Sequence, residues 1–307
     1  MKTILAFLKL IRWQNLLFIV LTQVLYDYCI YQPIYGSNSA QQLVLIILAS
    51  VLIAAAGYII NDYFDLNIDQ INKPNRVIVN NAVSRRWAIF WHLVFSLLGL
   101  FFTVMALPPS LFWYLILANL LSILLLWLYS TNFKKQLLVG NVIISMLTSW
   151  VILILFFSKT PLSVDNIISA DHKEIRLFRL TMLYAGFAFI ISLIREVLKD
   201  MEDRVGDARY GCRTMPIVWG LPASKVFVAV WIIVLAGTLV ILQLYVLAYG
   251  WWLSIAYCLL AIVAPLLIVL SKLTAAQSQQ DFHLLSRYVK GIMFAGILSM
   301  LFFYYYH

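Results

Sequence analysis

Residues 41–69 read QQLVLIILASVLIAAAGYIINDYFDLNID, and this stretch decides the fold. Its first part, residues 41–60, is almost entirely apolar. A helix of about 20 such residues crosses the roughly 30 Å of hydrocarbon in a bilayer. Three aspartates, Asp62, Asp65 and Asp69, follow directly after that run. The stretch predicts a membrane-spanning helix with a row of carboxylates at one end.

The composition of the whole chain agrees with a membrane protein. Of its 307 residues, 64% are hydrophobic and 11% are charged, and the mean hydropathy is +0.92. A soluble domain is about 45–50% apolar and about 25% charged. These values exclude a soluble enzyme, a disordered protein and a secreted disulfide scaffold. The three cysteines form no CxxC pair, and the four histidines form no HExxH motif. The sequence therefore carries no signature of a thiolate or zinc site.

Nine segments are long and apolar enough to span a bilayer as helices, and they predict an all-α polytopic membrane protein. No A-x-A cleavage signal follows the first apolar run, so we interpret it as a span. Asp27 lies near the outer end of this first segment, where we expect its side chain to reach interfacial water. The predicted spans are 16–35, 41–60, 87–106, 111–129, 137–157, 177–198, 222–246, 250–270 and 288–306.

The lysines and arginines are divided unequally between the two sides of this topology. One set of connections and termini holds 18 of the 22, and the opposite set holds four. Because cytoplasmic loops carry the excess of Lys and Arg, we expect the N-terminus in the cytoplasm and the C-terminus on the exoplasmic side. The protein is then an integral, multi-pass protein of the cell inner or plasma membrane. The net charge of +9 reflects this orientation, and no nucleic-acid partner is expected.

The acidic residues form two rows with the same spacing. Each row has aspartates at i, i+3 and i+7, which share one face of a helix. Three like charges on one face repel each other, and a hard divalent cation bound by carboxylate oxygens compensates them. Mg²⁺ takes one or two carboxylates and completes its shell with water and phosphate oxygens. We therefore predict a magnesium site for a diphosphate, with solvated polar loops as the alternative. The predicted metal ligands are Asp62, Asp65, Asp69, Asp200, Asp203 and Asp207.

Cations follow both acidic rows and the fourth predicted span, all on the predicted cytoplasmic side. Arginine and lysine side chains bind phosphate oxygens, so these residues are candidate diphosphate ligands. The alternative for each is a role in orienting the chain in the membrane. Tyr129, at the cytoplasmic end of the fourth span, is our candidate to stabilise an allylic cation. The candidate cations are Lys73, Arg76, Lys134, Lys135, Arg204 and Arg213.

At these residues the chain resembles the UbiA superfamily of intramembrane prenyltransferases. Residues 61–69 match the family pattern N-D-x-x-D-x-x-x-D. The two motif sequences are most similar to those of the digeranylgeranylglyceryl phosphate synthase (geranylgeranylglycerol-phosphate geranylgeranyltransferase) branch. Residues 61–76 match N-D-Y-F-D-x-x-I-D-x-x-N-x-P-x-R, and residues 199–216 match K-D-x-E-D-x-x-G-D-x-x-x-G-x-x-T-x-P. Arg12-Trp13-Gln14-Asn15 resembles the R-P-x-N motif that opens the first span, with Trp13 in place of Pro.

The resemblance implies a fold and an activity. It implies a single UbiA-type domain over residues 1–307, in which the Asp motifs at 61–76 and 199–216 form a pseudo-repeat. It also implies Mg²⁺-dependent transfer of a polyprenyl group from a prenyl diphosphate to a lipophilic acceptor in the bilayer. The branch implies geranylgeranyl transfer to geranylgeranylglyceryl phosphate or a similar hydroxyl acceptor. The implied catalytic residues are Asp65, Asp69, Asp203, Asp207 and Tyr129, and Arg12, Asn15 and Asn61 join the substrate-binding residues.

Several alternatives stay open at this point. The family commonly continues with P-I-P-S-G after the position of Arg76, whereas residues 77–81 here read VIVNN. An aromatic, quinone-precursor or chlorophyllide-type acceptor is therefore the closest alternative. A cation transporter with paired acids is the main alternative of another class, although transporter acids lie near the bilayer midplane. A CDP-alcohol phosphotransferase requires a D-G-x-x-A-R cluster, which the sequence lacks, and a membrane scaffold needs neither acidic row.

Overall fold

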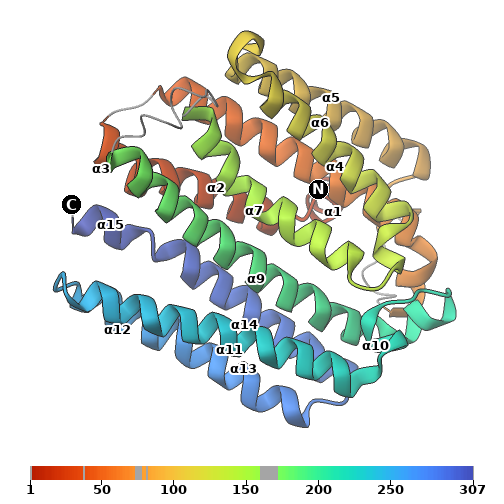
Figure 1. The fold of residues 1–307 in the computed structure, drawn as a ribbon. Coiled ribbons are helices and arrows are strands. Elements are labelled where there is room, and N and C mark those ends of the chain that lie inside the picture. The colour runs from red at the N-terminus through yellow and green to blue at the C-terminus, as the bar shows by residue number, and fades with distance from the viewer. Residues whose placement is uncertain (1, 37–38, 73–77, 81, 160–171, 307) are drawn as a thin grey trace.

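The computed structural model describes residues 2–36, 39–72, 78–80, 82–159 and 172–306. Within these ranges the chain is almost entirely helical, and the one β-bridge joins Val79 to Val83. The helices run roughly side by side and form a bundle (Figure 1). The predicted all-α architecture is confirmed.

Nine helices in the described residues are long and apolar enough to cross a membrane, as predicted. Three of these spans combine consecutive elements, because π-helical segments or short breaks interrupt them. The elements of the nine spans are α2 (Trp13–Leu25) with η1 (Tyr26–Tyr31) and α3 (Gln32–Tyr35), α4 (Ala40–Asn72), α5 (Arg85–Ala106), α6 (Pro109–Thr131), α7 (Val139–Lys159), α9 (His172–Arg209), α11 (Gly220–Leu247), α12 (Trp252–Tyr257) with η4 (Cys258–Val263) and α13 (Ala264–Ala275), and α14 (Gln279–Leu298) with α15 (Leu301–Tyr305). The shorter helices are α1 (Lys2–Leu10), η3 (Phe133–Lys135) and α10 (Met215–Val218).

Helices α4 and α9 are much longer than the predicted spans 41–60 and 177–198. They contain 33 and 38 residues. At 1.5 Å per residue these helices are about 50 and 57 Å long, well beyond the roughly 30 Å of hydrocarbon. The apolar pattern marks only the part in lipid, whereas the backbone stays helical through the acidic stretch. Both rows of aspartates therefore lie on helices, as the i, i+3, i+7 spacing predicts.

The first span contains a π-helical turn at Asp27, and here the prediction was wrong. The Asp27 side chain is buried, with the residue only 2% exposed, and does not reach interfacial water. Its carboxylate accepts a hydrogen bond of 2.9 Å from the Gln32 side chain. The backbone hydrogen bonds of a π-turn join residues five apart, and here the Gln32 N–H donates to the Asp27 carbonyl, which places the two residues side by side. Gln32 therefore takes the place of water as a hydrogen-bond partner of the Asp27 carboxylate.

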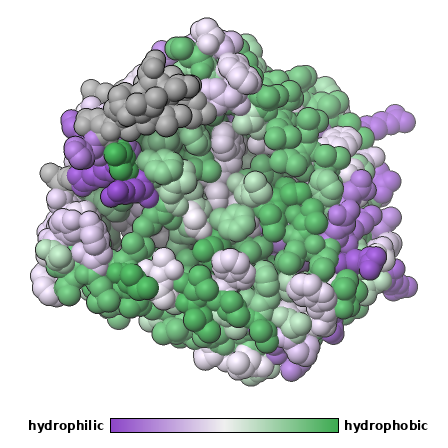
Figure 2. All heavy atoms as spheres, viewed as in Figure 1, coloured by the Kyte–Doolittle hydropathy of each residue, from purple (hydrophilic) through white to green (hydrophobic). Residues whose placement is uncertain are grey.

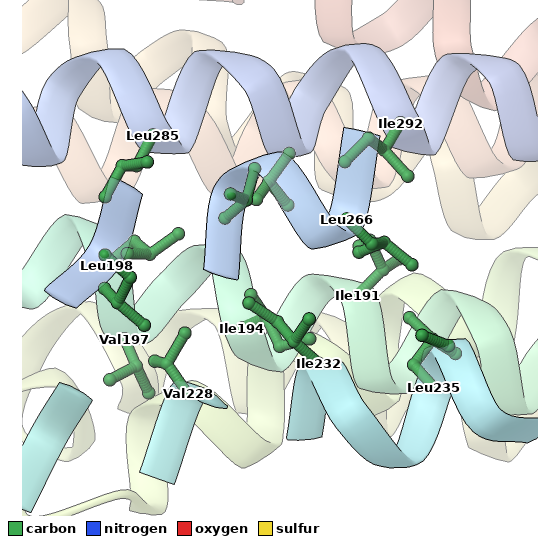
Figure 3. Close-up of a cluster of buried hydrophobic side chains, with 14 of the residues drawn as sticks. Ile191, Ile194, Val197, Leu198, Val228, Ile232, Leu235, Leu266, Leu285 and Ile292 are labelled. Carbon is green, nitrogen blue, oxygen red and sulfur yellow. The ribbon is translucent and has the colours of Figure 1, made fainter. Parts of the chain in front are cut away.

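Helix α9 lies at the centre of the bundle, between α7 on one side and α11 and α14 on the other (Figure 1). One buried hydrophobic cluster joins α9 to α11, α13 and α14. Figure 3 shows Ile194 and Val197 of α9 facing Ile232 and Val228 of α11 within this cluster. A second cluster joins α9 to η1, α4, α6 and α7. Burial on both sides fixes α9, and with it the second acidic row.

The surface is mainly hydrophobic across the middle of the molecule (Figure 2). Hydrophilic residues gather at the edge near α10, and a smaller group lies at the opposite edge (Figure 2). An apolar belt between two polar ends is the surface expected of a protein that spans a bilayer. The end near α10 is also where α4 and α9 finish and the acidic rows lie.

Candidate active site

A single large cavity brings both acidic rows together. Its volume is about 1200 Å³, and all six aspartates of the two rows line it. The first row comes from the end of α4 and the second from the end of α9, which are far apart in the sequence. The paired carboxylate rows therefore face one shared space.

Two protein cations already neutralise part of the first row. Arg12 donates to Asp62 over 2.7 Å, and Lys134 forms an ion pair with Asp65. Asn61 also donates to Asp65 over 2.8 Å. The sequence argument assigned the compensation of these charges to a divalent cation, and the structure shows that Arg12 and Lys134 supply part of it.

Arg12 occupies an unusual backbone position. It has φ = 51° and ψ = 51°, in the left-handed region, and it joins α1 to α2. Its guanidinium carbon lies 5.0 Å from the centre of the Tyr58 ring, a cation–π distance. Burial lowers the pKa of Arg12, but Asp62 and Tyr58 outweigh this effect, so the pKa is raised and the charge persists. A left-handed arginine whose guanidinium is held by two partners is the kind of strained residue that functional sites retain.

The second row has polar partners from a different helix. Asn141, at the start of α7, donates to Asp200 over 2.8 Å. Asp203 and Asp207 line the cavity one and two turns further along α9. Asp200 is therefore held by a neutral donor, whereas Asp62 and Asp65 each pair with a cation.

Asn72 joins the ends of the two acidic helices. Its side-chain amide donates to the backbone carbonyl of Asp203 over 2.9 Å and accepts from the backbone N–H of Gly206 over 2.8 Å. A Cβ atom at position 206 would overlap the Asn72 amide, so this close approach requires glycine. The pair fixes the spacing between the two rows.

Tyr129, at the end of α6, and Lys134, in η3 between α6 and α7, both line the cavity. A Cβ atom at Gly140 would lie 2.8 Å from the Lys134 Cα and 3.1 Å from the Tyr129 ring. Glycine at this position therefore lets α7 pack closely against the connection. The charges of Glu196, Asp65 and Asp200 all act on Tyr129, which places its ring near the acidic end of the cavity.

The structure gathers most, but not all, of the predicted site residues. Lys135 and Arg213 are exposed, and Arg204 is half-buried, and none of the three lines the cavity. The Arg213 backbone N–H donates to the Lys135 carbonyl over 2.7 Å, so these two connections support each other structurally. Lys73 and Arg76 lie outside the described residues. The predicted residues that line the cavity are Arg12, Asn15, Asn61, Asp62, Asp65, Asp69, Tyr129, Lys134, Asp200, Asp203 and Asp207.

Charged residues that sequence reasoning did not assign to the site also line the cavity. Arg195, Glu196 and Lys199 lie on α9 just before the second row, and Lys290 lies on α14. The sequence did contain an indication for Arg195, Glu196 and Lys199, since three charged residues at the end of an otherwise apolar span are usually functional. Lys290 gives no such signal, since it lies at a predicted span end.

Away from its acidic end, the cavity becomes apolar. Phe18, Phe187 and Met293 line this part, with a few small polar groups among them. Asn119 accepts from the Trp150 indole over 2.9 Å, so this buried amide is already satisfied inside the protein. The cavity is therefore amphiphilic, with a charged head region and a long apolar region.

The carboxylates fit a cation that is shared with a ligand. Among the residues that the structure describes, no three His, Cys, Asp or Glu side chains cluster closely enough to enclose an ion. Mg²⁺ needs only one or two carboxylates when water and phosphates supply the other oxygens. The Asn61 side-chain oxygen is buried and lacks a hydrogen-bond partner, although it lines the same cavity. An unsatisfied oxygen donor beside the aspartates is consistent with such an ion or its water.

Comparison with known sequences identifies the family. The model of the UbiA prenyltransferase family matches residues 12–303. A digeranylgeranylglyceryl phosphate synthase of Methanopyrus kandleri is 31% identical over 258 residues, which cover 84% of this chain and 86% of the relative. The enzyme of the same name from Natronomonas pharaonis is 32% identical over 264 residues, which cover 86% and 85%.

Solved structures share the fold. A structure of a digeranylgeranylglyceryl phosphate synthase has a TM-score of 0.63 at 21% identity and covers 98% of this chain and 99% of its own. A UbiA homologue from Archaeoglobus fulgidus bound to DMAPP and Mg²⁺ has a TM-score of 0.57 at 17% identity, with 95% and 99% coverage. At these identities the structures show a common fold. Together with the family match, they show that this chain is an integral, multi-pass membrane prenyltransferase and belongs to the UbiA prenyltransferase family.

Proposed function

We propose that the protein transfers a geranylgeranyl group from geranylgeranyl diphosphate to the hydroxyl of geranylgeranylglyceryl phosphate, with Mg²⁺ as cofactor. The observation that carries this proposal is the amphiphilic cavity, which has both acidic rows at one end and an apolar region that continues between the helices. The relatives that share the name digeranylgeranylglyceryl phosphate synthase support the choice of acceptor.

The two acidic rows hold the cofactor and the diphosphate in this proposal. When bound, Mg²⁺ neutralises the diphosphate and makes it a better leaving group. The carboxylates come from two helices whose ends are tied together through Asn72 and Gly206, so their separation is preset. The proposed ligands are Asp62, Asp65, Asp69, Asp200, Asp203 and Asp207.

Arg12 and Lys134 stabilise the departing diphosphate. Both cations lie beside the first row, and each contacts one of its carboxylates. Asn15 and Asn61 line the same end and supply neutral hydrogen-bonding groups. Positive charge fixed before the reaction stabilises the negative charge that develops on the leaving group.

The bond changes follow from this placement. The C1–O bond of the donor breaks and the diphosphate leaves with the electron pair, while the acceptor hydroxyl oxygen bonds to C1. The hydroxyl proton passes to a diphosphate oxygen or to water. The Tyr129 ring lies near the acidic end and stabilises positive charge at C1. The surrounding helices exclude water, which limits hydrolysis of the donor.

The orientation of the protein follows from its charges. We infer that both acidic rows face the cytoplasm, with the N-terminus on that side and the C-terminus outside. The distribution of cations supports this orientation, because the set of connections and termini that includes both acidic rows holds 18 of the 22 lysines and arginines, and the positive-inside rule assigns that side to the cytoplasm. Since both rows meet in one cavity, the chain acts as a single domain with a pseudo-repeat of its Asp motifs.

The direct experiment uses purified protein with geranylgeranyl diphosphate, geranylgeranylglyceryl phosphate and MgCl₂. We expect diphosphate release and a product whose mass equals that of the acceptor with one added geranylgeranyl group. Product formation with an aromatic acceptor alone would assign the protein to another branch of the family. Absence of diphosphate release with every acceptor would overturn the proposal.

A further inference from the structure

A second group of cations lines the cavity on the side formed by α9 and α14. Its members are Arg195 and Lys199 of α9 and Lys290 of α14. Arg195 and Lys199 both bind the Glu196 carboxylate, over 3.0 and 2.8 Å. Lys290 donates to the Asn15 side chain over 2.7 Å. Asn15 lies on α2, so three helices converge on this group.

This group is separate from the cations that serve the first acidic row. Arg12 and Lys134 contact Asp62 and Asp65 on α4. Arg195 precedes Asp200 by five residues, which places it about 7.5 Å along the helix axis from the second row, toward the membrane. Lys199 directly precedes Asp200, and the Lys290 Nζ lies 5.3 Å from the centre of the Phe18 ring, so the cluster extends from the second row toward the apolar part of the cavity.

The cluster has more positive charge than its acidic partner neutralises. Glu196 pairs with Arg195 and Lys199, and the charge of Asp200 also acts on Lys199, whereas Lys290 donates to the neutral Asn15 side chain. The charges of Arg195 and Lys199 also repel that of Lys290. The Arg195 Nε–H is buried without a hydrogen-bond partner. A partly buried lysine whose hydrogen-bond partner is neutral, next to an arginine with an unused donor, favours an anionic ligand.

We propose that Arg195, Lys199 and Lys290 bind the phosphate group of the acceptor. This inference rests on the proposed function, in which the acceptor is a phosphoglyceride. The acceptor phosphate lies on the same glycerol as the attacking hydroxyl, only a few bonds away. That hydroxyl must come within about 3.5 Å of C1 of the donor. The acceptor phosphate therefore lies near the diphosphate, and two neighbouring anions require two separate groups of cations.

The same cluster gives the enzyme its selectivity for the acceptor. A phosphate monoester carries about −1.5 to −2 charges at pH 7, so it gains more from these three cations than a neutral acceptor does. An aromatic or neutral acceptor leaves these cations in a half-buried site without an anion, which is unfavourable. Glu196 acts as a positioning residue, because it holds Arg195 and Lys199 on the same side.

The test compares two acceptors that differ only in the phosphate, geranylgeranylglyceryl phosphate and geranylgeranylglycerol. Single variants Arg195→Gln, Lys199→Gln and Lys290→Gln are assayed for kcat and KM with each acceptor and for the KM of the donor. We expect the KM for the phosphorylated acceptor to rise about 10-fold or more, as for a lost charge-assisted hydrogen bond. The KM of the donor should change less than about twofold, and the preference for the phosphorylated acceptor should fall.

Arg287→Gln is the matched control. Arg287 lies on α14 one turn before Lys290, is exposed, and does not line the cavity. It removes the same charge from the same helix, so we expect wild-type values for both acceptors. Lys290→Arg keeps the charge and should keep most of the preference for the phosphorylated acceptor. If a glutamine variant loses turnover with both acceptors, the variant that keeps the positive charge at that position (Arg195→Lys, Lys199→Arg or Lys290→Arg) is measured in its place. We then expect a partial reduction in the preference for the phosphorylated acceptor.

Two outcomes overturn the inference and remain distinguishable. If the wild-type enzyme prenylates an acceptor without phosphate and ignores geranylgeranylglyceryl phosphate, the proposed function fails and the subsite fails with it. If the wild-type enzyme uses geranylgeranylglyceryl phosphate but the variants keep their preference, or raise the KM of the donor instead, only the subsite is overturned.

Discussion

At the scale of single residues, the carboxylates of the two rows differ in their partners. Asp65 lies between Lys134 and Asn61, whereas Asp203 has its backbone carbonyl fixed by Asn72. Removing the charge of either carboxylate takes away one ligand of the proposed ion without changing the size of the side chain. The two positions therefore test the metal site from two different helices.

We expect Asp65→Asn and Asp203→Asn each to lower kcat by at least about 100-fold, the usual cost of losing one fixed electrostatic contact in an active site. Diphosphate release at saturating substrate, followed across a MgCl₂ titration, measures the effect. Asp281→Asn is the control, since Asp281 is an exposed acid on α14 that does not line the cavity. Wild-type turnover in both site variants would refute the assignment of these ligands.

At the scale of elements, the contact between the ends of α4 and α9 sets the distance between the acidic rows. Asn72 forms two hydrogen bonds to the α9 backbone, and Gly206 makes room for its amide. Neither residue carries charge, so both act on the reaction through the position of the aspartates.

We expect Asn72→Ala to destabilise the protein by about 1–3 kcal/mol, because it removes two hydrogen bonds between the end of α4 and the α9 backbone. Gly206→Ala should have a similar effect through overlap with Asn72. Thermal unfolding in detergent measures stability, and the MgCl₂ concentration for half-maximal activity should rise in both variants. Gln279→Ala, which loses one exposed contact to the Asn72 carbonyl, should behave like wild type. An unchanged MgCl₂ requirement in Asn72→Ala would show that the contact does not position the rows.

At the scale of the whole molecule, the fold separates two polar ends by an apolar belt (Figure 2), and both acidic rows lie at one of these ends, where α4 and α9 finish. Gln136 lies in the connection between η3 and α7 at that end, and Ala248 lies in the turn between α11 and α12. Both residues are exposed. The proposed topology places them on opposite sides of the membrane.

Single variants Gln136→Cys and Ala248→Cys test this orientation with a membrane-impermeant maleimide on intact cells. We expect rapid labelling of Ala248→Cys, and labelling of Gln136→Cys only after the membrane is opened. The three native cysteines are buried. Burial, with a smaller effect from Asp207, raises the pKa of Cys212 to about 11, so below that pH its thiol stays protonated and reacts slowly. The reverse labelling pattern would invert the proposed topology.

The sequence predicted those features that depend on local periodicity. The nine spans and the helical faces of Asp62, Asp65 and Asp69 follow from runs of apolar residues and from an i, i+3, i+7 spacing. The contact of Lys290 with Asn15 joins residues 275 positions apart and depends on how α14 packs against α2. Asp27 was misplaced for the same reason, since its burial depends on a π-turn that no local pattern announced.

The ion pairs of Arg12 with Asp62 and of Lys134 with Asp65 have a thermodynamic consequence. Each cation reaches a phosphate oxygen more readily once its carboxylate has turned to another positive partner. A cation that binds Asp62 and Asp65 therefore leaves Arg12 and Lys134 available to an anion. Conversely, an anion that binds Arg12 and Lys134 leaves the two carboxylates available to a cation. Because such coupling is reciprocal, the affinity for either charge rises when the other is present. The two ion pairs therefore favour binding of the cation and the anion together over binding of either ligand alone.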